Sequence, residues 1–165
     1  MYNLLRINNM TEEMCKKNYK PLASEIADLV NLNIDFSNNE TYSQESIDKL
    51  KLNKTTDFIL KMIERSFVIC IYDQNTLIAC GFLTQVDNRF FSKSLHVHPN
   101  FRGKGFAKLI CNEREKFLRR LGIDVLYIES LKFQKTIDFH KLNGFKVERP
   151  YKKLENTILM KKIIR

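Results

Sequence analysis

Hydrophobic residues in the first third of the chain recur mainly at helical spacing. Four of them mark one buried helix face: Leu22, Ile26, Leu29 and Val30. A second helical region is predicted over residues 44–65, with an interruption near Asn53, and residues 37–40 have the composition of a loop. Ahead of these, residues 2–7 alternate loosely and predict a first strand, while Thr11, followed by two glutamates, predicts a helix start.

The period of the pattern changes to that of strands at Ser66. Residues 67–72 form a continuous apolar run, which is typical of a strand covered on both faces. A polar turn at 73–75 leads into residues 77–83, so these two segments predict a β-hairpin. Residues 90–97 predict the strand that follows.

An amphipathic helix is predicted over residues 106–121, and Gly122 ends it. Its expected buried face consists of Phe106, Leu109, Ile110, Phe117, Leu118 and Leu121. Its expected outward positions are Lys108, Asn112, Glu115, Arg119 and Arg120. A strand over residues 123–128 follows. Because strand, helix and strand succeed one another at this spacing, the two strands should lie parallel in a βαβ unit.

The last part of the chain predicts one more helix and two closing strands. Three residues at helical spacing mark the helix: Phe133, Ile137 and His140. Gly144 ends this helix, and residues 145–147 and 158–160 predict the strands.

The residues best suited to chemistry lie at 95–107, between a strand and the amphipathic helix. The loop there holds two glycines, Gly103 and Gly105, and two cations, Arg102 and Lys104. Glycine permits positive φ and close approach of a ligand. A helix that begins directly after such a loop points unpaired N–H groups and the positive end of its dipole at one place. This arrangement suits a phosphate or pyrophosphate.

Two common phosphate loops do not fit these residues. The Walker pattern needs Lys and then Ser or Thr after its glycine, whereas Gly105 is followed by Phe106 and Ala107. The dinucleotide fingerprint needs a third glycine where Lys108 stands.

The pattern that does fit is Arg-x-x-Gly-x-Ala, met by Arg102, Gly105 and Ala107 and preceded by Val97, His98 and Pro99. It resembles the acyl-CoA-binding motif of the GNAT superfamily of N-acyltransferases, whose signature is Gln/Arg-x-x-Gly-x-Gly/Ala. The resemblance implies a pyrophosphate site formed by Arg102, Gly103, Lys104, Gly105, Phe106 and Ala107. It also implies that the preceding strand carries a bulge and splays from the next one. The backbones of Leu95, His96 and Val97 would then bind the pantetheine arm in the resulting slot, much like an added strand.

A second family signature matches in part. GNAT members often end a helix with Tyr-x-x-x-Gly-Phe, where the tyrosine can protonate the departing CoA thiolate. This chain has Gly144 and Phe145, but His140 stands in place of the tyrosine. An asparagine common at the start of that helix is replaced by Phe133. The resemblance covers about residues 67–160.

Three residues are candidates for proton transfer. His140 is one by its alignment with the family tyrosine, and its alternative role is packing in the core. Glu129, at the end of a predicted strand, could take a proton from the incoming ammonium, or it is a solvated carboxylate. His96 could act as a base through a water molecule. His96 and His98 share a strand face, but further ligands at metal spacing are missing, so we expect no metal site.

The composition gives the chain a net positive charge. The chain has 165 residues, 44% of them hydrophobic, which is enough for one domain with a core. The 28 Lys and Arg against 19 Asp and Glu give a net charge of +9, which attracts polyanions such as coenzyme A or nucleic acid. The cations are scattered along the chain and form no basic stripe with stacking aromatic residues, so we expect no nucleic-acid partner.

The cysteines and the N-terminus bear on the compartment. Cys15, Cys70, Cys80 and Cys111 include no Cys-x-x-Cys pair. The first ten residues carry Arg6 as their one cation and have no long apolar block, and no apolar run approaches the ~20 residues of a membrane span. We therefore expect reduced thiols, no signal peptide, no membrane association and a cytoplasmic protein.

The residues and the resemblance together predict an α/β fold. We expect one GNAT-like domain over residues 1–165, with a mixed central β-sheet flanked by helices and a splayed strand pair that forms the CoA slot. The implied activity is transfer of acetyl from acetyl-CoA to a primary amine by direct attack in a ternary complex. The acceptor would be a small molecule or a peptide or protein amine, and residues 34–65 would shape its site.

Two alternatives to this activity remain open. One is a CoA-binding sensor without turnover, and the other is a basic nucleic-acid-binding or regulatory module. The acyl group and the oligomeric state, including a homodimer, also stay open.

Overall fold

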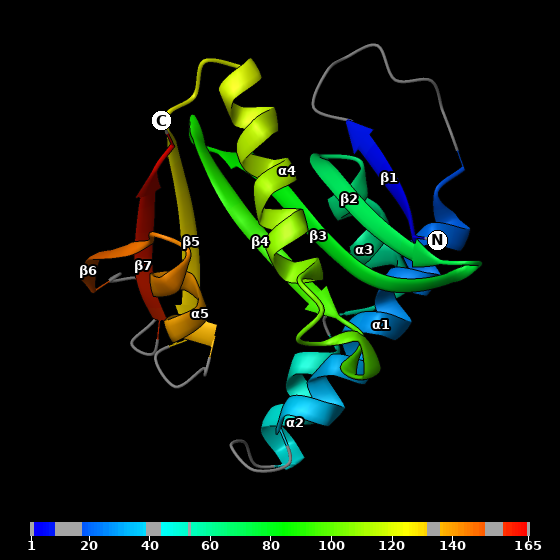
Figure 1. Ribbon diagram of the computed structural model, residues 1–165. Coiled ribbons are helices and arrows are strands. Elements are labelled where there is room, and N and C mark those ends of the chain that lie inside the picture. Colours follow the sequence, from blue (N-terminus) through cyan, green and yellow to red (C-terminus); the bar gives the residue numbers. More distant parts are fainter. Residues whose placement is uncertain are drawn as a thin grey trace. The chain divides into compact units, whose positions relative to one another are not determined.

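The computed structural model describes residues 2–8, 18–38, 44–52, 54–131, 136–150 and 157–164. The elements follow in the order β1 (Tyr2–Asn8), α1 (Lys20–Asn38), α2 (Gln44–Leu52), α3 (Thr56–Ile63), β2 (Ser66–Asp73), β3 (Thr76–Val86), β4 (Arg89–Val97), a 3-10 turn (Pro99–Phe101), α4 (Phe106–Arg120), β5 (Val125–Leu131), α5 (Thr136–Leu142), β6 (Lys146–Pro150) and β7 (Thr157–Ile163) (Figure 1).

The strands form a mixed sheet in the order β1-β2-β3-β4-β5-β7-β6. Strands β1 and β2 are antiparallel, as are β5 with β7 and β6 with β7. Strands β4 and β5 are parallel, which confirms the predicted βαβ unit with α4 as its crossover helix. The α/β class and the mixed sheet flanked by helices are therefore confirmed.

The chain divides into two compact units, which are described separately below. The first contains Met1–Phe82 and Ser94–Cys111, and the second contains Leu83–Lys93 and Asn112–Arg165. The organisation of residues 1–165 as one GNAT-like domain stays a prediction.

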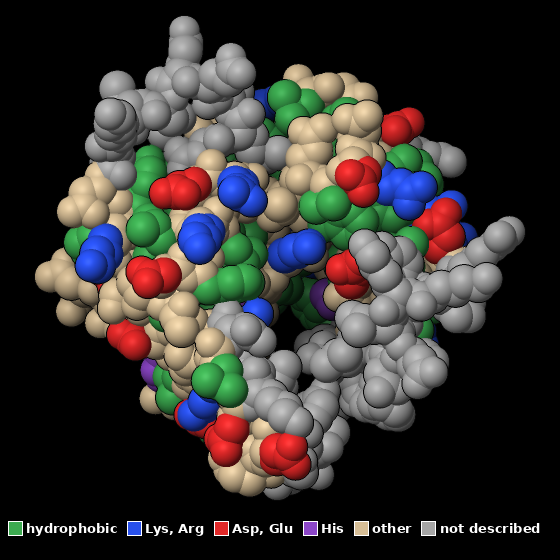
Figure 2. All heavy atoms as spheres, turned by 180° about the vertical axis from the view of Figure 1, so that it is seen from behind, with side chains coloured by type: hydrophobic (Ala, Val, Ile, Leu, Met, Phe, Trp, Pro, Cys, Tyr) green, Lys and Arg blue, Asp and Glu red, His purple; other side chains and the backbone are tan. Residues whose placement is uncertain are grey.

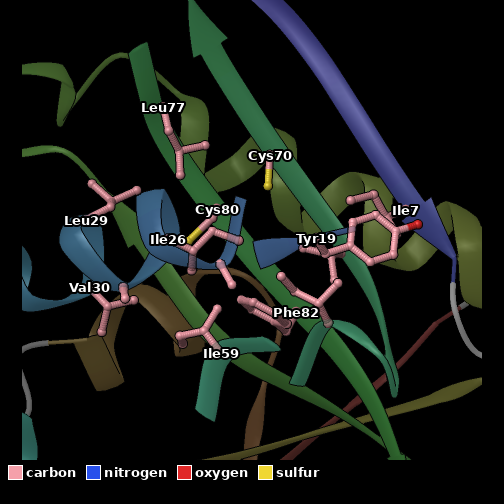
Figure 3. Close-up of a cluster of buried hydrophobic side chains, with 14 residues drawn as sticks. Ile7, Tyr19, Ile26, Leu29, Val30, Ile59, Cys70, Leu77, Cys80 and Phe82 are labelled. Atoms are coloured by element: carbon pink, nitrogen blue, oxygen red, sulfur yellow. The ribbon is translucent and has the colours of Figure 1, made fainter. Parts of the chain in front are cut away.

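The first unit has its hydrophobic core between helices α1 and α3 and strands β1 to β3 (Figure 3). Ile26 of α1, Ile59 of α3 and Phe82 of β3 meet in this cluster and are almost completely buried. The helical face predicted for α1 is confirmed, because Ile26, Leu29 and Val30 are all buried. Helix α3 begins where Thr55 Oγ1 accepts a hydrogen bond from Phe58 N at 3.3 Å, which is a regular N-cap.

The boundaries of some predicted elements differ from the structure. Ser37 and Asn38, expected in a loop, form the last residues of α1. The predicted helical region 44–65 is indeed interrupted, because α2 ends at Leu52 and α3 starts at Thr56. Several expected features lie outside the described residues, namely the helix start at Thr11, Cys15, Asn53 and Phe133.

Helix α4 buries a different set of side chains from the one its pattern predicts. Leu109 and Leu121 were expected to be buried but are 37% and 49% exposed. Glu115 was expected to face outward but is 7% exposed. Its carboxylate accepts hydrogen bonds from Lys162 Nζ at 2.6 Å and from Arg119 Nη2 at 3.3 Å. The prediction for Glu115 is wrong because cations satisfy the charge that burial would otherwise penalise.

The burial of α1 leads to a stability prediction for the first unit. Replacing Ile26 by alanine should lower the free energy of unfolding by about 2–5 kcal/mol, because the side chain is fully buried and leaves a cavity. The matched change Leu32→Ala on the same helix removes a side chain that is 41% exposed, so it should cost about 1 kcal/mol or less. Chemical denaturation measures both, and equal losses would contradict this placement of the core.

Candidate functional site

The chain turns sharply where β4 ends, and His98 holds that turn. The backbone N–H of His98 donates to the carbonyl of Ile78 on β3 at 2.7 Å. Its Nδ1 accepts a hydrogen bond from Asn100 N at 3.3 Å, and its ring meets Phe101 edge-on with 5.7 Å between centroids. These contacts assign His98 a structural part in directing the chain into the next loop.

The backbone of β4 departs from regular strand geometry just before this turn. Ser94 has a φ of 48°, which a residue with a side chain adopts rarely inside a strand. The irregularity lies in the strand for which the family resemblance implies a bulge. Leu95, His96 and Val97, the three predicted pantetheine-binding positions, follow it and are half-buried.

The loop after this turn has the backbone of an anion-binding site. Gly103 and Gly105 have φ values of 76° and 86°, and a Cβ added at either would meet no atom within 4 Å. The carbonyl of Gly105 accepts from Leu109 N at 3.0 Å, so Gly105 is the residue from which α4 starts. The N–H groups of the first helical turn therefore have no acceptor within the helix and face the loop. These features fit a phosphate or pyrophosphate.

The two cations of the loop are exposed, and each lies against an aromatic ring. Arg102 lies over Phe36 with 4.8 Å from Cζ to the ring centroid. Lys104 lies over Phe101 with 4.9 Å from Nζ to the centroid. Cation–π contacts restrict the side chains without cancelling their charge. The loop thus combines open space, helix-end N–H groups and two positive charges.

Phe106 and Ala107 complete the predicted pyrophosphate segment. The ring of Phe106 is buried and meets Tyr2 of β1 edge-on with 4.7 Å between centroids. Its side chain therefore anchors the start of α4, which leaves its backbone N–H as the group suited to a ligand. Ala107 is half-buried.

The second unit contains a buried arginine that sequence reasoning missed. Arg114 is 0% exposed, and its guanidinium donates to Ser92 Oγ at 2.6 Å and to the carbonyl of Lys93 at 2.7 Å. The parallel pairing of β4 with β5 joins Phe90 to Leu126 and Phe91 to Tyr127, just before these two residues. Arg114 thus donates hydrogen bonds to β4 just beyond the part of that strand that pairs with β5.

A signal for Arg114 was present in the sequence. Ile110, Arg114 and Leu118 are spaced four residues apart, so all three lie on one face of α4, and all three are fully buried. Helical spacing would have placed Arg114 inward. Its charge points the other way, because charged side chains are usually exposed.

His140 lies on α5 at the point where that helix ends. The N–H of Phe145 donates to the carbonyl of His140, and the N–H of Gly144 donates to Lys141, while Gly144 has a φ of 87°. This is a Schellman motif, in which the flanking residues also make an apolar contact. That contact is the edge-on packing of His140 against Phe145 at 5.8 Å between ring centroids.

The environment of His140 disfavours its charged form. The residue is 9% exposed, and its Nδ1 is buried without a hydrogen-bond partner among the described residues. Burial, and secondarily the positive charge of Arg114, lower the pKa of His140 from its ordinary 6.5 to about 4. The imidazole is therefore neutral at neutral pH.

The remaining candidates for proton transfer have less distinctive surroundings. Glu129 is exposed on β5, opposite Leu159 of β7. His96 is half-buried on β4. The predicted CoA-binding residues belong to the first unit, and Glu129 and His140 belong to the second. The catalytic roles of these three residues stay predictions.

The other side chains that could react or bind a metal are buried or dispersed. Cys70, Cys80 and Cys111 are buried, and burial raises the pKa of the Cys70 thiol, with Cys80 adding to the effect. Within the described residues, His, Cys, Asp and Glu side chains form no group of three that could hold a metal ion. No helix in the described part of the chain is long and apolar enough to cross a membrane.

The surface charges do not gather into a basic stripe on the face shown in Figure 2. There, Lys and Arg side chains of the described residues alternate with Asp and Glu side chains. Ion pairs among the described residues also join charges of opposite sign, including Lys116 with Glu113 and Lys161 with Glu148. Such mixing gives a polyanion few places where cations act together.

Comparison with known proteins identifies relatives of this chain. Residues 28–145 match the model of the acetyltransferase (GNAT) family. A search of curated proteins found no match.

Solved structures share the fold at low sequence identity. The PaiA N-acetyltransferase of Thermoplasma acidophilum, solved in complex with coenzyme A, has a TM-score of 0.81 at 17% identity, over 99% of both chains. An aminoglycoside 6'-acetyltransferase type Ii has a TM-score of 0.67 at 16% identity, over 99% of this chain and 97% of that one. The ribosomal-protein-S18-alanine N-acetyltransferase of Escherichia coli has a TM-score of 0.61 at 15% identity, over 99% and 94%.

The lowered pKa of His140 predicts how stability depends on pH. The unfolded chain binds a proton at His140 near pH 6.5 and the folded protein near pH 4, so the unfolded state holds more protons between these values. This difference lowers the free energy of unfolding. The loss is absent above pH 6.5, grows as the pH falls toward 4, and reaches at most about 3 kcal/mol.

The variant His140→Phe removes this penalty while keeping an aromatic ring in the core. The difference in unfolding free energy between variant and wild type should shift in favour of the variant as pH falls from 7 to 4. Denaturant titrations at several pH values measure it. A difference that does not change with pH would contradict the placement of His140.

Proposed function

Because the chain belongs to the GNAT acetyltransferase family and is thus an acyl-CoA-dependent N-acyltransferase, we propose that it transfers acetyl from acetyl-CoA to a primary amine by direct attack in a ternary complex. The observation that carries this proposal is the loop from Arg102 to Ala107. It joins two glycines of positive φ, two exposed cations and the N-terminus of α4. Each of these features suits a pyrophosphate.

Each part of acetyl-CoA has a proposed place along the chain. Arg102, Gly103, Lys104 and Gly105 bind the pyrophosphate, together with the N–H groups of Phe106 and Ala107. The backbones of Leu95, His96 and Val97 hold the pantetheine arm as an added strand would be held. Binding in this way orients the thioester for attack.

The reaction needs a neutral amine and a stabilised leaving group. In the proposal, Glu129 takes the proton of the incoming ammonium, and His96 acting through a water is the alternative. The amine nitrogen then attacks the thioester carbonyl and the C–S bond breaks. The nitrogen gives up one further proton, which ends on the departing thiolate, so the products are the amide and free CoA thiol. His140 is neutral at neutral pH, so it assists by donating an N–H to the developing thiolate rather than as an imidazolium.

The proposal specifies the acceptor only as a primary amine. The fold hosts many substrates, so structural likeness does not select one. The relatives named above act on an aminoglycoside and on a ribosomal-protein alanine, and both types of amine belong in a test panel. We further propose that residues 34–65 shape the acceptor site and that the protein acts in the cytoplasm without a nucleic-acid partner. A homodimer remains open.

The proposed activity is tested by release of free CoA thiol from acetyl-CoA. The panel should hold an aminoglycoside, a peptide with N-terminal alanine, a lysine-containing peptide and simple alkylamines. Amine-dependent release supports transfer. Binding of acetyl-CoA without release for any amine would favour the sensor alternative.

Acetyl-CoA should stabilise the folded protein. At a hundred times its dissociation constant it should raise the free energy of unfolding by about 2.7 kcal/mol, and the melting temperature by about 5–10 °C. The variant Gly105→Val should lose this shift, because valine disfavours the φ of 86° and its side chain would enter the loop.

Gly122→Val is a matched control for that experiment. Gly122 has a φ of 68° with no atom within 4 Å of an added Cβ, and it follows the other end of α4. It should suffer comparable backbone strain yet keep the shift with acetyl-CoA. Loss of the shift in both variants would mean that strain, not the phosphate site, is responsible.

The part proposed for His140 predicts an effect on turnover. His140→Phe keeps the aromatic volume but removes the N–H, and should lower kcat about 10²-fold with little change in acetyl-CoA affinity. Because the imidazole is neutral above about pH 5, this loss should be the same from pH 6 to 9. A variant with the kcat of the wild type would show that His140 only packs.

A further inference from the structure

Arg102 connects the phosphate loop to a helix far away in the sequence. Its Nη2 donates to Asn33 Oδ1 on α1 at 2.6 Å, and the two residues are 69 positions apart. Its Nε lies 3.4 Å from the carbonyl of Val97, at the end of β4. The ring of Phe36, one helical turn after Asn33, lies against the same guanidinium. All these residues belong to the first unit.

Asn33 is itself held in one orientation. It is 6% exposed, and its Nδ2 donates to the carbonyl of Leu29 at 2.9 Å. This bond fixes which end of the amide is the oxygen, so Oδ1 faces Arg102. A buried amide with both ends bonded in this way cannot rotate without losing two hydrogen bonds.

The two oxygens named above, Asn33 Oδ1 and the carbonyl of Val97, are neutral. An amide oxygen and a backbone carbonyl accept hydrogen bonds without cancelling the positive charge of the guanidinium. A carboxylate at position 33 would form an ion pair and remove that charge from the loop. A guanidinium carries five N–H donors, so contacts with Asn33 and Val97 are compatible with a bond to an anion. The side chain also remains exposed at the loop.

We infer that Asn33 is a positioning residue for the phosphates of acetyl-CoA and acts through Arg102, with Phe36 as a second support. The amide holds the guanidinium at the loop and brings no opposite charge to it. This restriction lowers the conformational entropy that Arg102 would lose on binding an anion. The inference rests on the proposed function, in which the loop after Pro99 binds acetyl-CoA.

The test is a calorimetric titration of acetyl-CoA into Asn33→Ala. The dissociation constant should rise about five- to tenfold, because Arg102 loses a short charge-assisted hydrogen bond. Asn31→Ala is the matched control. Asn31 lies on the same helix, and its Nδ2 donates to the carbonyl of Lys54 rather than toward the loop. The affinity of the Asn31→Ala variant for acetyl-CoA should stay within about twofold of the wild-type affinity.

A double-mutant cycle separates positioning from general stability. In the background Arg102→Met, the further change Asn33→Ala should have no effect on affinity, because the side chain through which it acts is gone. Equal effects in both backgrounds would overturn the inference. So would unchanged affinity in Asn33→Ala, or tighter binding, which would mean that Asn33 holds Arg102 away from the ligand.

A second variant covers the case in which Asn33→Ala does not fold. Asn33→Asp keeps the size and the acceptor oxygen but places a carboxylate against Arg102. It should weaken acetyl-CoA binding, and unchanged affinity would overturn the inference. Its second carboxylate oxygen replaces the Nδ2 donor to the Leu29 carbonyl, so the melting temperature of the variant checks that it folds. A wild-type protein that does not bind acetyl-CoA contradicts the proposed function itself, whereas binding that ignores position 33 contradicts only the positioning role.

Discussion

The start of helix α4 is the constraint on which the proposed chemistry depends. The helix begins directly after Gly105, whose φ of 86° lets the chain leave the loop and enter the helix in one step. Phe106, the next residue, is buried against Tyr2 and fixes the direction of that first turn. Since His98 holds the other side of the loop to β3, both ends are held by backbone and core contacts. The N–H groups and the two cations are therefore oriented by the fold before any ligand binds.

Much of this arrangement could be predicted from local pattern. The apolar run 67–72 is a strand whose side chains are almost all buried, as a continuous run indicates. The change of period at Ser66 marked the border between helices and strands, and the strand–helix–strand spacing implied that β4 and β5 are parallel. The two glycines and two cations at 102–105 predicted an anion loop, because glycine φ values and helix ends are local properties.

What could not be predicted depends on partners distant in sequence. Glu115 is buried because Lys162, 47 residues later, bonds to its carboxylate, and periodicity carries no information on that pair. Asn33 meets Arg102 across 69 residues, so an asparagine in a helix gave no sign of a connection to the loop. His140 was placed on an apolar stripe, but the shift of its pKa to about 4 arises from tertiary burial and from the nearby charge of a buried arginine. Tertiary contacts of polar groups thus account for most of the differences.

The three buried thiols can report how often the core of this protein opens. Cys70 and Cys80 are 0% exposed and Cys111 is 8% exposed, and the raised pKa of Cys70 keeps it in the unreactive thiol form. An alkylating reagent can reach Cys70 and Cys80 only when the hairpin strands separate from α1 and α3. Their labelling rates therefore measure how often the core of the first unit opens, residue by residue and under native conditions. The same burial keeps these sulfurs silent in a colorimetric thiol assay for as long as the protein stays folded.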